Sequence, residues 1–465
     1  MKEDKLFCIC GLIVGIVLLF YVLSPYSPTC LLRSCIHKQN DHTGFLYAVQ
    51  TKKTTKYLMR YTRDNSSNMS VLVFIHIQKT AGTLLERRLV KDGLVGKTCY
   101  CFFKRRCNCK TQSGNTWLVS RYSTGWVCGL HADLTELTEC IDSKLNKVDH
   151  HIIKRKYIYF TLLRDPVDRF ISEWQHIRRG ATWHSATLRC NKQYPPPEHY
   201  KPCYFNEEIV ENISSNVSIK SVIDCPYNLA SNRQTRMLAN LSSLGCYKHL
   251  TKWSQPLNVT VLTHIPPVSL ALLNSAKHNL VNIISCYGLS EYLIYSQYIL
   301  QKCLHITFKR SFIEFNKISF MKQRLLFTHA TIIRSNLNQS TLHEIQHVNK
   351  LDIFLYNFAK QLFVYRLVNY LLFDSNIPLH FRRPLHTIWH NRLRSKSYTY
   401  LSYLLFSNPI INYHDANISS NAFSYRFNLF LTKLFIRKGS IPVSESVLTS
   451  EDKKWSDRLS YDFKI

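Results

Sequence analysis

The first folded element is predicted from Val71-Leu-Val-Phe-Ile-His-Ile-Gln-Lys-Thr-Ala-Gly-Thr83, an apolar run followed by a short polar turn. The β-branched content of 71–77 is typical of a buried strand, and the apolar residues of 84–90 recur at helical spacing. The turn between them carries a lysine, two threonines and a glycine. A strand, a tight turn and a helix in this order predict a parallel α/β sheet.

The same order of elements recurs further along the chain. A strand is predicted over Tyr157-Ile-Tyr-Phe-Thr-Leu-Leu163, a turn over Arg164-Asp-Pro166, and a helix from about Val167 through Arg178. From residue 220 to about 372 the pattern becomes mainly helical. We therefore expect an α/β fold in which helices flank a central parallel sheet.

The turn around Lys79 has the residues of an anion site. A helix N-terminus presents free N–H groups and the positive end of its dipole, to which Lys79 adds a charge and Thr80 and Thr83 add hydroxyl donors. The full G-x4-G-K-[ST] pattern is missing, so a kinase or ATPase is disfavoured. The alternative is a solvated lysine beside threonines that cap the helix.

Arg164 and Ser172 form a second candidate anion site. They lie eight positions apart across the second strand-to-helix turn, where a guanidinium and a hydroxyl can bind another phosphate. Two such sites predict a ligand with two phosphate groups. The same turn also has a structural interpretation, with Asp165 as N-cap and Pro166 at the first helical position, and the two interpretations are compatible.

The composition is that of a folded, strongly basic protein. Of 465 residues, 60 are Lys or Arg and 30 are Asp or Glu, which gives a formal net charge of +30. Apolar residues make up 45% and aromatic residues 13%, so the chain is not globally disordered. With 13 Gly and 15 Pro, collagen-like and low-complexity architectures are excluded. Charge spread along the length favours a polyanionic partner: nucleic acid, an anionic membrane or an acidic polysaccharide.

An apolar segment near the start predicts a membrane anchor. Leu6–Leu23 contains 18 residues without a charge, about the minimum length that spans a bilayer. No small-residue cleavage site follows it, so a signal-anchor is favoured over a cleaved signal peptide. Two lysines before it are matched by Arg33 and Lys38, so charge does not fix the orientation. We expect residues 1–5 to be a cytosolic tail and residues 24–70 a polar stem.

The cysteines and glycosylation sequons favour a lumenal body. Sixteen cysteines, fourteen of them after the apolar segment, indicate an oxidising compartment. Cys99, Cys101, Cys107 and Cys109 form a C-x-C-x5-C-x-C pattern whose spacing departs from that of zinc sites, so disulfides are favoured over zinc and no metal is expected. Eight N-x-S/T sequons agree with a glycosylated domain, at Asn65, Asn68, Asn212, Asn216, Asn240, Asn258, Asn338 and Asn417. The expected topology is single-pass type II, in the secretory pathway.

Five motifs occur in order along the chain. They are Phe74-Ile-His-Ile-Gln-Lys-Thr-Ala-Gly-Thr83, Ser123-Thr-Gly-Trp-Val-Cys-Gly-Leu-His-Ala-Asp133, Leu163-Arg-Asp-Pro-Val-Asp-Arg-Phe-Ile-Ser-Glu-Trp174, Arg179-Gly-Ala-Thr-Trp183, and Cys225-Pro-Tyr-Asn-Leu-Ala230 with Asn232-Arg-Gln-Thr-Arg-Met-Leu238. This set resembles the heparan sulfate 6-O-sulfotransferase family over roughly residues 71–372. The resemblance implies a P-loop-like sulfotransferase fold and a Golgi membrane protein with a lumenal catalytic domain. It also implies transfer of a sulfonate from 3′-phosphoadenylyl sulfate (PAPS) to the 6-hydroxyl of glucosamine in heparan sulfate.

The resemblance also implies roles for residues at the two turns. Lys79, with Thr80, Gly82 and Thr83, would hold the 5′-phosphosulfate of PAPS. Arg164 and Ser172 would hold its 3′-phosphate. Lys79 would further neutralise charge on the bridging oxygen of the leaving nucleotide. The remaining donor-binding positions implied by the family are His76, Gln78, Ala81, Ile313 and Phe315.

His131 occupies the position of the family's catalytic base. A sugar hydroxyl must lose a proton as it attacks sulfur, and a neutral imidazole accepts one near pH 7. Guanidinium groups bind carboxylates and sulfates, and flat rings pack on sugars, although tryptophans here have core packing as their alternative. The resemblance points to an acceptor site made of Arg105, Arg106, Arg121, Trp126, His131, His176 and Trp183. The neighbouring Asn232, Arg233 and Arg236 either line the site or brace a helix.

Two positions depart from the family pattern, and the C-terminal region does not match it. Ala81 replaces the second glycine of Lys-Thr-Gly-Gly-Thr, which matters if that position needs a positive φ. Leu134 stands where the family has tryptophan. Residues 373–465 are predicted to be a basic extension of unknown role. The alternatives are a non-catalytic heparan-binding protein and a sulfotransferase acting on another position, such as the 2-O of uronic acid; nucleic-acid binding is disfavoured because recognition motifs are missing.

Overall fold

The computed structural model describes residues 69–91, 98–102, 106–178, 183, 186–203, 217–309, 312 and 334–373. Within these residues the sheet has four parallel strands in the order β2-β1-β3-β4. The strands are β1 (Met69–Ile75), β2 (Leu118–Val119), β3 (Arg155–Leu163) and β4 (Ile284–Leu289). The predicted α/β class with a central parallel sheet is confirmed.

The central strands are apolar because the sheet is covered on both faces. Residues 71–75 of β1 are at most 4% exposed, as expected for a strand of a parallel sheet. Phe74 pairs with Phe160, and Ile75 with Thr161, across β1 and β3. The hydroxyl of Thr161 donates to the carbonyl of Ile75 at 2.8 Å. The turns that leave β1 and β3 therefore start close together at one edge of the sheet.

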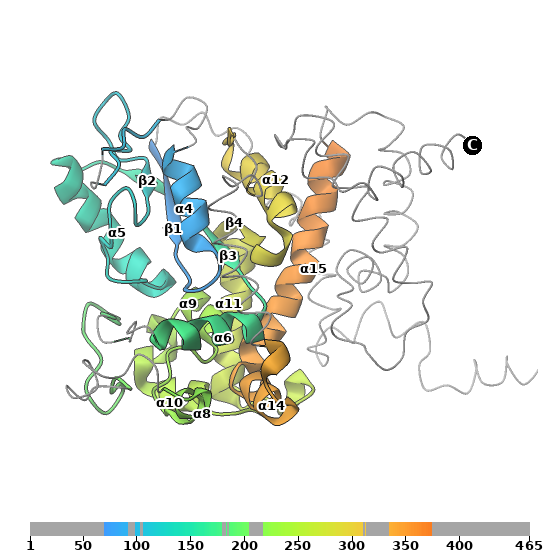
Figure 1. The fold of residues 1–465 in the computed structure, drawn as a ribbon. Helices are drawn as coiled ribbons and strands as arrows, with labels where there is room; N and C mark the ends of the chain where they lie inside the picture. The colour runs from blue at the N-terminus through green and yellow to red at the C-terminus, as the bar shows by residue number, and fades with distance from the viewer. Residues whose placement is uncertain are drawn as a thin grey trace, which may run out of the picture. The chain divides into compact units, whose positions relative to one another are not determined.

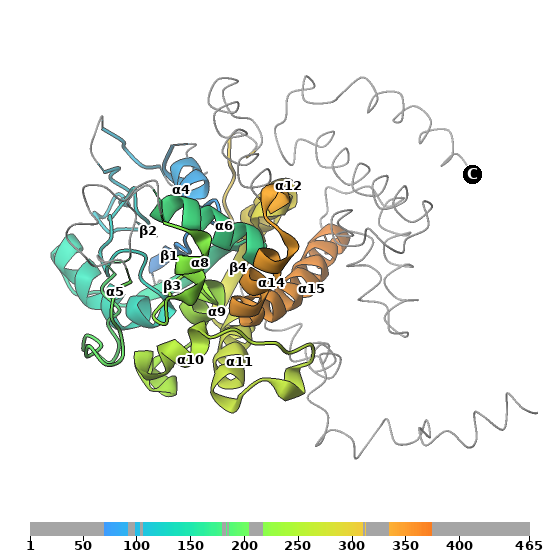
Figure 2. The ribbon, with the colours of Figure 1, turned by 60° about the horizontal axis from the view of Figure 1, so that its bottom comes forward.

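Helices lie on both sides of this sheet. The longer ones are α4 (Gly82–Lys91), α5 (Leu134–Asp149), α6 (Pro166–Ile177), α11 (Pro267–Asn282), α12 (Leu293–Leu304), α14 (Gln339–Val348) and α15 (Lys350–Phe373). The shorter ones are α8 (Ile219–Asp224), α9 (Arg233–Leu238) and α10 (Leu250–Ser254), with 3-10 turns at Ser242–Leu244, Cys246–His249, Leu262–His264 and Ser290–Tyr292. Figure 1 shows α5 on the β2 side of the sheet, and α12 and α15 on the β4 side. Helices α6, α9 and α14 gather at the ends where the strands finish (Figures 1 and 2).

The structure corrects four details of the predicted elements. β1 ends at Ile75 and not at Ile77, because the N–H of Ile77 turns back to the carbonyl of Ile75 at 3.1 Å. β2 has only two residues and gave no pattern in the sequence. β4 interrupts the region predicted to be mainly helical, and it was missed because it is short, begins two residues after α11 ends and contains a serine and a glycine. The helix predicted over 167–178 is α6, which begins one residue earlier at Pro166.

Within the described residues, twelve cysteines are paired in six disulfides. The C-x-C-x5-C-x-C pattern forms Cys99–Cys109 nested around Cys101–Cys107, so the preference for disulfides over zinc is confirmed. The other four pairs are Cys128–Cys140, Cys190–Cys246, Cys203–Cys225 and Cys286–Cys303. Such cross-links agree with an oxidising compartment.

Several predictions concern regions outside the described residues. The apolar segment 6–23 falls there, as do residues 24–68 of the predicted stem 24–70 and residues 374–465 of the predicted extension 373–465. Residues 69 and 70 of the predicted stem instead begin β1, and Phe373 is the last residue of α15. None of the helices in the described part combines the length and the apolar character that crossing a bilayer requires. Three sequons are described, at Asn240, Asn258 and Asn338, and all three are exposed.

Candidate functional site

The turn between β1 and α4 has an unusual backbone. Lys79 and Ala81 have φ values of 66° and 68°, in the left-handed region that favours glycine. The buried Thr80 donates its hydroxyl hydrogen to the carbonyl of Ile77 at 2.9 Å and closes the turn. A Cβ at Gly82 would lie 2.9 Å from Nε2 of His76, so only glycine lets α4 begin this close to that ring. The positive φ anticipated as a possible problem at Ala81 is thus present.

His76 links this turn to the loop after β2. Its Nδ1 lies 2.7 Å from Oε2 of Glu86, a buried carboxylate on α4. The other oxygen of Glu86 accepts the backbone N–H of Arg121 at 2.7 Å. One carboxylate therefore joins the loops that carry the predicted donor and acceptor residues. Nothing in the local sequence pattern singled out Glu86.

His131 reaches the same turn from the loop before α5. Its Nδ1 lies 3.0 Å from the backbone carbonyl of His76. Because a carbonyl only accepts hydrogen bonds, the proton of neutral His131 is assigned to Nδ1, and Nε2 keeps its lone pair. The rings of Trp126 and His76 are centred 4.5 and 4.8 Å away. Burial first, and then the nearby charge of His76, hold the pKa of His131 well below its usual 6.5. The imidazole is therefore neutral at pH 7.

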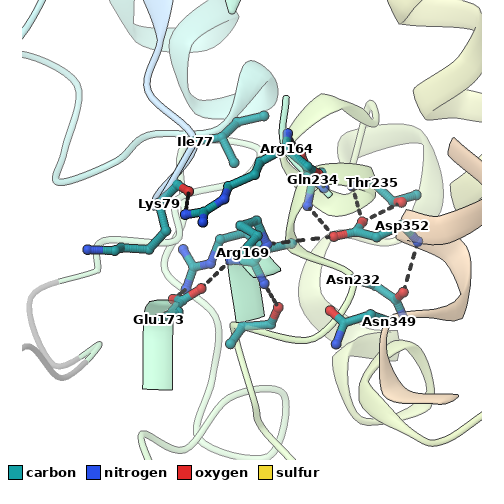
Figure 3. A network of polar contacts seen from close by, with 12 residues as sticks. Ile77, Lys79, Arg164, Arg169, Glu173, Asn232, Gln234, Thr235, Asn349 and Asp352 are labelled. Atoms are coloured by element: carbon teal, nitrogen blue, oxygen red, sulfur yellow. Dashed lines mark hydrogen bonds and ion pairs between the residues drawn. The ribbon is translucent and has the colours of Figure 1, made fainter. Parts of the chain in front are cut away.

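Arg164 reaches the turn from the end of β3. Its Nη1 donates to the carbonyl of Lys79 at 3.1 Å (Figure 3). Asp165 is the N-cap of α6 and accepts from the N–H groups of Val167 and Asp168, and Pro166 is the first helical residue. The structural interpretation of this turn is confirmed, and Arg164 is free of the capping task. Arg164 of the second predicted anion site therefore contacts the turn that carries the first.

A buried charge cluster lies beside these turns. Glu173 of α6 pairs with Arg169 of the same helix and, at 2.8 Å, with Arg233 of α9. Trp183 donates its indole N–H to the same carboxylate at 3.0 Å. Burial alone would raise the pKa of Glu173, but the charges of Arg233 and Arg169 lower it to about 2. Glu173 therefore stays ionised and fixes Trp183 and Arg233.

A pocket of about 390 Å³, its opening to solvent included, adjoins His131. It is lined by Gln78, Leu130, His131, Asp133, Glu136, Trp183, Ala186, Leu188, Leu229, Arg233, Arg236 and Met237. The predicted Gln78, His131 and Trp183 thus share one cavity. Arg233 and Arg236 line it, whereas Asn232 braces a helix by accepting the N–H groups of Leu351 and Asp352 at 2.9 and 3.1 Å. Asn232 thus has the bracing role, and a role of Arg233 and Arg236 in substrate binding stays a prediction.

Two acids in the wall of this pocket form a capping box at the start of α5. Asp133 accepts the N–H of Glu136, and Glu136 accepts the N–H of Asp133. Burial, together with the charge of Asp133, raises the pKa of Glu136 to about 8. The D-x-x-E spacing is a recognised capping signal that could have found Glu136 in the sequence. Leu134, which departs from the family pattern, is the buried first residue of α5.

Apart from His131 and Trp183 in the pocket, the other predicted acceptor residues and three donor residues fall into three groups. Arg106, Arg121 and Trp126 lie on the segment around β2: Arg106 donates to the carbonyl of Thr124 at 3.0 Å, and the guanidinium of Arg121 lies 5.7 Å from the ring centre of Trp126. Ser172, from the donor set, and His176 lie on α6, both partly exposed. Arg105, Ile313 and Phe315 lie outside the described residues.

Comparison with known proteins gives a consistent family. The model described as "Sulfotransferase family" matches residues 65–359. Heparan-sulfate 6-O-sulfotransferase 1-B of Danio rerio is 41% identical over 301 residues, which are 64% of this chain and 66% of that protein. Heparan-sulfate 6-O-sulfotransferase 3 of Mus musculus is 39% identical over 67% of this chain and 62% of its own length. Heparan-sulfate 6-O-sulfotransferase 1 of Homo sapiens is 39% identical over 66% of this chain and 69% of its own length.

The match spans just under two thirds of the length of the zebrafish and mouse relatives. The family model, over residues 65–359, includes every described residue of the two turns and of the pocket. The family model covers well over half of the chain, and the three relatives are 39 to 41% identical to it. The chain belongs to the sulfotransferase family and, within it, to the heparan-sulfate 6-O-sulfotransferases.

Proposed function

We propose that this chain transfers a sulfonate group from PAPS to the 6-hydroxyl of glucosamine residues in heparan sulfate. One observation carries the proposal. The turn 76–79 receives the candidate base on one carbonyl and the candidate phosphate ligand on another, through His131 to His76 and Arg164 to Lys79. A base and an anion site on the same short turn are what a group transfer from an anionic donor requires.

The residues of the two turns fit the donor. The N-terminal N–H groups of α4, the charge of Lys79 and the hydroxyl of Thr83 suit the 5′-phosphosulfate. Arg164 suits the 3′-phosphate, because its planar guanidinium matches the geometry of phosphate oxygens and lies at the donor turn, where it donates to the carbonyl of Lys79. Ser172 completes this second site from α6. His76, Gln78, Thr80, Ala81 and Gly82 shape the turn, in keeping with a P-loop-like sulfotransferase fold.

PAPS would supply the sulfuryl group, and this chain's residues would move the proton and balance the charge. Nε2 of His131 accepts the proton of the 6-hydroxyl as that oxygen forms its bond to sulfur. The bond between sulfur and the bridging oxygen of the donor breaks, and adenosine 3′,5′-bisphosphate leaves. Lys79 neutralises the charge that develops on the bridging oxygen. The hydrogen bond from Nδ1 of His131 to the carbonyl of His76 keeps the accepting nitrogen in the correct tautomer.

The acceptor would lie across the pocket beside His131. Trp183, Arg233 and Arg236 form one wall, and Arg121 and Trp126 lie on the loop that packs against His131. Guanidinium groups suit the sulfates and carboxylates of heparan sulfate. Arg105, Arg106 and His176 extend this set in the proposal.

The proposal places the enzyme in the Golgi membrane. Residues 6–23 would be the signal-anchor, 71–372 the lumenal sulfotransferase domain and 373–465 a basic extension. The disulfides and the three exposed sequons support a secretory-pathway location.

The test is a transfer assay on the full-length chain with labelled PAPS and desulfated heparan, followed by disaccharide mapping. Wild type should place label on the 6-O position of glucosamine, and His131→Ala should lose about 10²- to 10⁴-fold in rate, the range for a general base. Label on the 2-O of uronic acid would contradict the assigned position. Equal 6-O signals from wild type and His131→Ala would show that His131 is not the base, and no transfer by wild type would leave only a heparan-binding protein.

A further inference from the structure

We infer that Gln234 is a positioning residue for donor binding: its side-chain amide fixes the backbone of Arg164 so that the guanidinium meets the 3′-phosphate. The inference rests on the proposed function and deepens it. It concerns a residue 70 positions away from Arg164 that none of the sequence patterns assigned to the site.

The amide of Gln234 holds Arg164 by both of its backbone groups. Oε1 accepts the N–H of Arg164 at 2.9 Å, and Nε2 donates to the carbonyl of Arg164 at 2.9 Å. Arg164 lies between the last residue of β3 and the N-cap Asp165. The amide thus pairs with this residue as a neighbouring strand would, beyond the point where β3 ends. Gln234 is 1% exposed, so water does not compete for these bonds.

Gln234 is itself anchored to the long helix α15. Its backbone N–H donates to Oδ2 of Asp352 at 3.1 Å, and the backbone N–H of Thr235 donates to Oδ1 at 2.7 Å (Figure 3). Asp352 therefore caps α9, whereas Asn232 at the start of α9 caps α15. This reciprocal capping leaves α9, and with it Gln234, little freedom to shift.

The hydrogen bonds form a continuous path to the donor turn. Asp352 holds Gln234, Gln234 holds Arg164, and Arg164 donates to the carbonyl of Lys79. A guanidinium can bond that carbonyl and a phosphate together only if its backbone is fixed, because both partners demand a set direction. Without the Gln234 amide, the backbone of Arg164 would be free to shift, and its guanidinium would be poorly oriented toward the phosphate.

The experiment compares two nucleotides that differ only in the group Arg164 would bind. Isothermal titration calorimetry on the full-length chain in detergent measures the dissociation constants of adenosine 3′,5′-bisphosphate and adenosine 5′-phosphate. Their ratio isolates the contribution of the 3′-phosphate. Wild type should prefer the bisphosphate by about 10- to 100-fold, the range for hydrogen bonds to a charged group.

Gln234→Met removes the amide and keeps its length, and the preference should fall about five- to tenfold. Thr235→Val is the matched control: it removes a buried hydrogen bond to Asp352 from the adjacent residue, without touching Arg164. Its preference for the bisphosphate should equal that of wild type. In an Arg164→Met background, adding Gln234→Met should change the preference for the bisphosphate by less than twofold. Gln234 acts on the phosphate only through the Arg164 guanidinium, which this background already lacks.

The possible results separate the inference from the proposed function. A full preference in Gln234→Met, or an equal loss in Thr235→Val, would overturn the positioning role while PAPS binding stood. No preference in wild type would overturn the proposed donor site and the inference with it. Gln234→Glu, which still accepts the N–H of Arg164, provides a second variant should Gln234→Met fold poorly, and its preference should fall between those of Gln234→Met and wild type.

Discussion

The turns after β1 and β3 both join a strand to a helix, but they keep their shapes by different means. The turn after β3 follows standard capping rules, with Asp165 as N-cap and Pro166 at the first helical position. The turn after β1 has two non-glycine residues in the left-handed region, Lys79 and Ala81. Its carbonyls are held by His131 and Arg164, which come from other loops.

This difference indicates which turn performs the chemistry. The turn after β3 has its own helix cap, and the amide of Gln234 also holds the backbone of Arg164, so this turn can support the side chain of Arg164 without strained residues. A turn with residues in unfavourable conformations persists only when its surroundings hold it, and such sites often bind ligands. Here the groups that hold the turn are the same groups proposed to bind the donor and to remove the proton.

Replacing Arg164 breaks the connection between the two turns and should have the largest effect of the tests that follow. Arg164→Met should raise the KM for PAPS about 10- to 100-fold, because a charged hydrogen-bond donor to phosphate is lost together with the bond to Lys79. Steady-state kinetics with varied PAPS measures this. The KM of Arg164→Lys for PAPS should lie between those of wild type and Arg164→Met, since an ammonium group cannot reproduce the planar fork of a guanidinium. A wild-type KM in Arg164→Met would contradict the assignment.

The meeting of these turns follows from the sequence, whereas their support does not. Two buried strands with connected helices predict a parallel sheet, and the ends of neighbouring parallel strands lie at one edge. This agrees with the prediction that the sites of Lys79 and Arg164 bind one ligand with two phosphate groups. Gln234 and Asp352 contact that edge from 70 and more residues away, and no local pattern encodes such pairings. β4 was missed for a related reason, because its short strand depends on pairing with β3 and not on its own composition.

The pH dependence of the rate tests the state of His131, which contacts the β1 turn at the carbonyl of His76. A base must be neutral, and burial lowers the pKa of His131 well below 6.5. With saturating PAPS, kcat/KM for the acceptor should therefore stay constant from pH 7.5 down to 6.5 and fall only below that. An unshifted imidazole would already have lost about half its activity at pH 6.5.

One control is needed for this profile. The 3′-phosphate of the donor titrates near pH 6, as phosphate monoesters do, so binding of adenosine 3′,5′-bisphosphate is measured at the same pH values. A rate that halves at pH 6.5 or above, with binding unchanged, would mean that His131 is not desolvated as the structure has it.

Ala81→Gly should have the smallest effect of these tests. Unlike the other changes, which impair binding or rate, it should increase the free energy of unfolding. A left-handed conformation costs a non-glycine residue about 1 to 2 kcal/mol, and glycine returns about 0.4 to 1 kcal/mol through the greater freedom of the unfolded chain. The free energy of unfolding should rise by about 0.5 to 1 kcal/mol, as measured by urea denaturation. Ala239→Gly is the matched control, since Ala239 has a φ of −75° and should only lose stability.

The sign of Ala81→Gly decides whether the β1 turn is strained at all. If both alanine-to-glycine variants lose stability equally, the left-handed residue at 81 has no cost and the contrast between the two turns fails. If Ala81→Gly gains stability and Ala239→Gly loses it, the β1 turn stores energy that the β3 turn does not. The contacts from His131 and Arg164 then hold a conformation that residues 76–81 disfavour, and loosening either contact should relax the turn away from the donor.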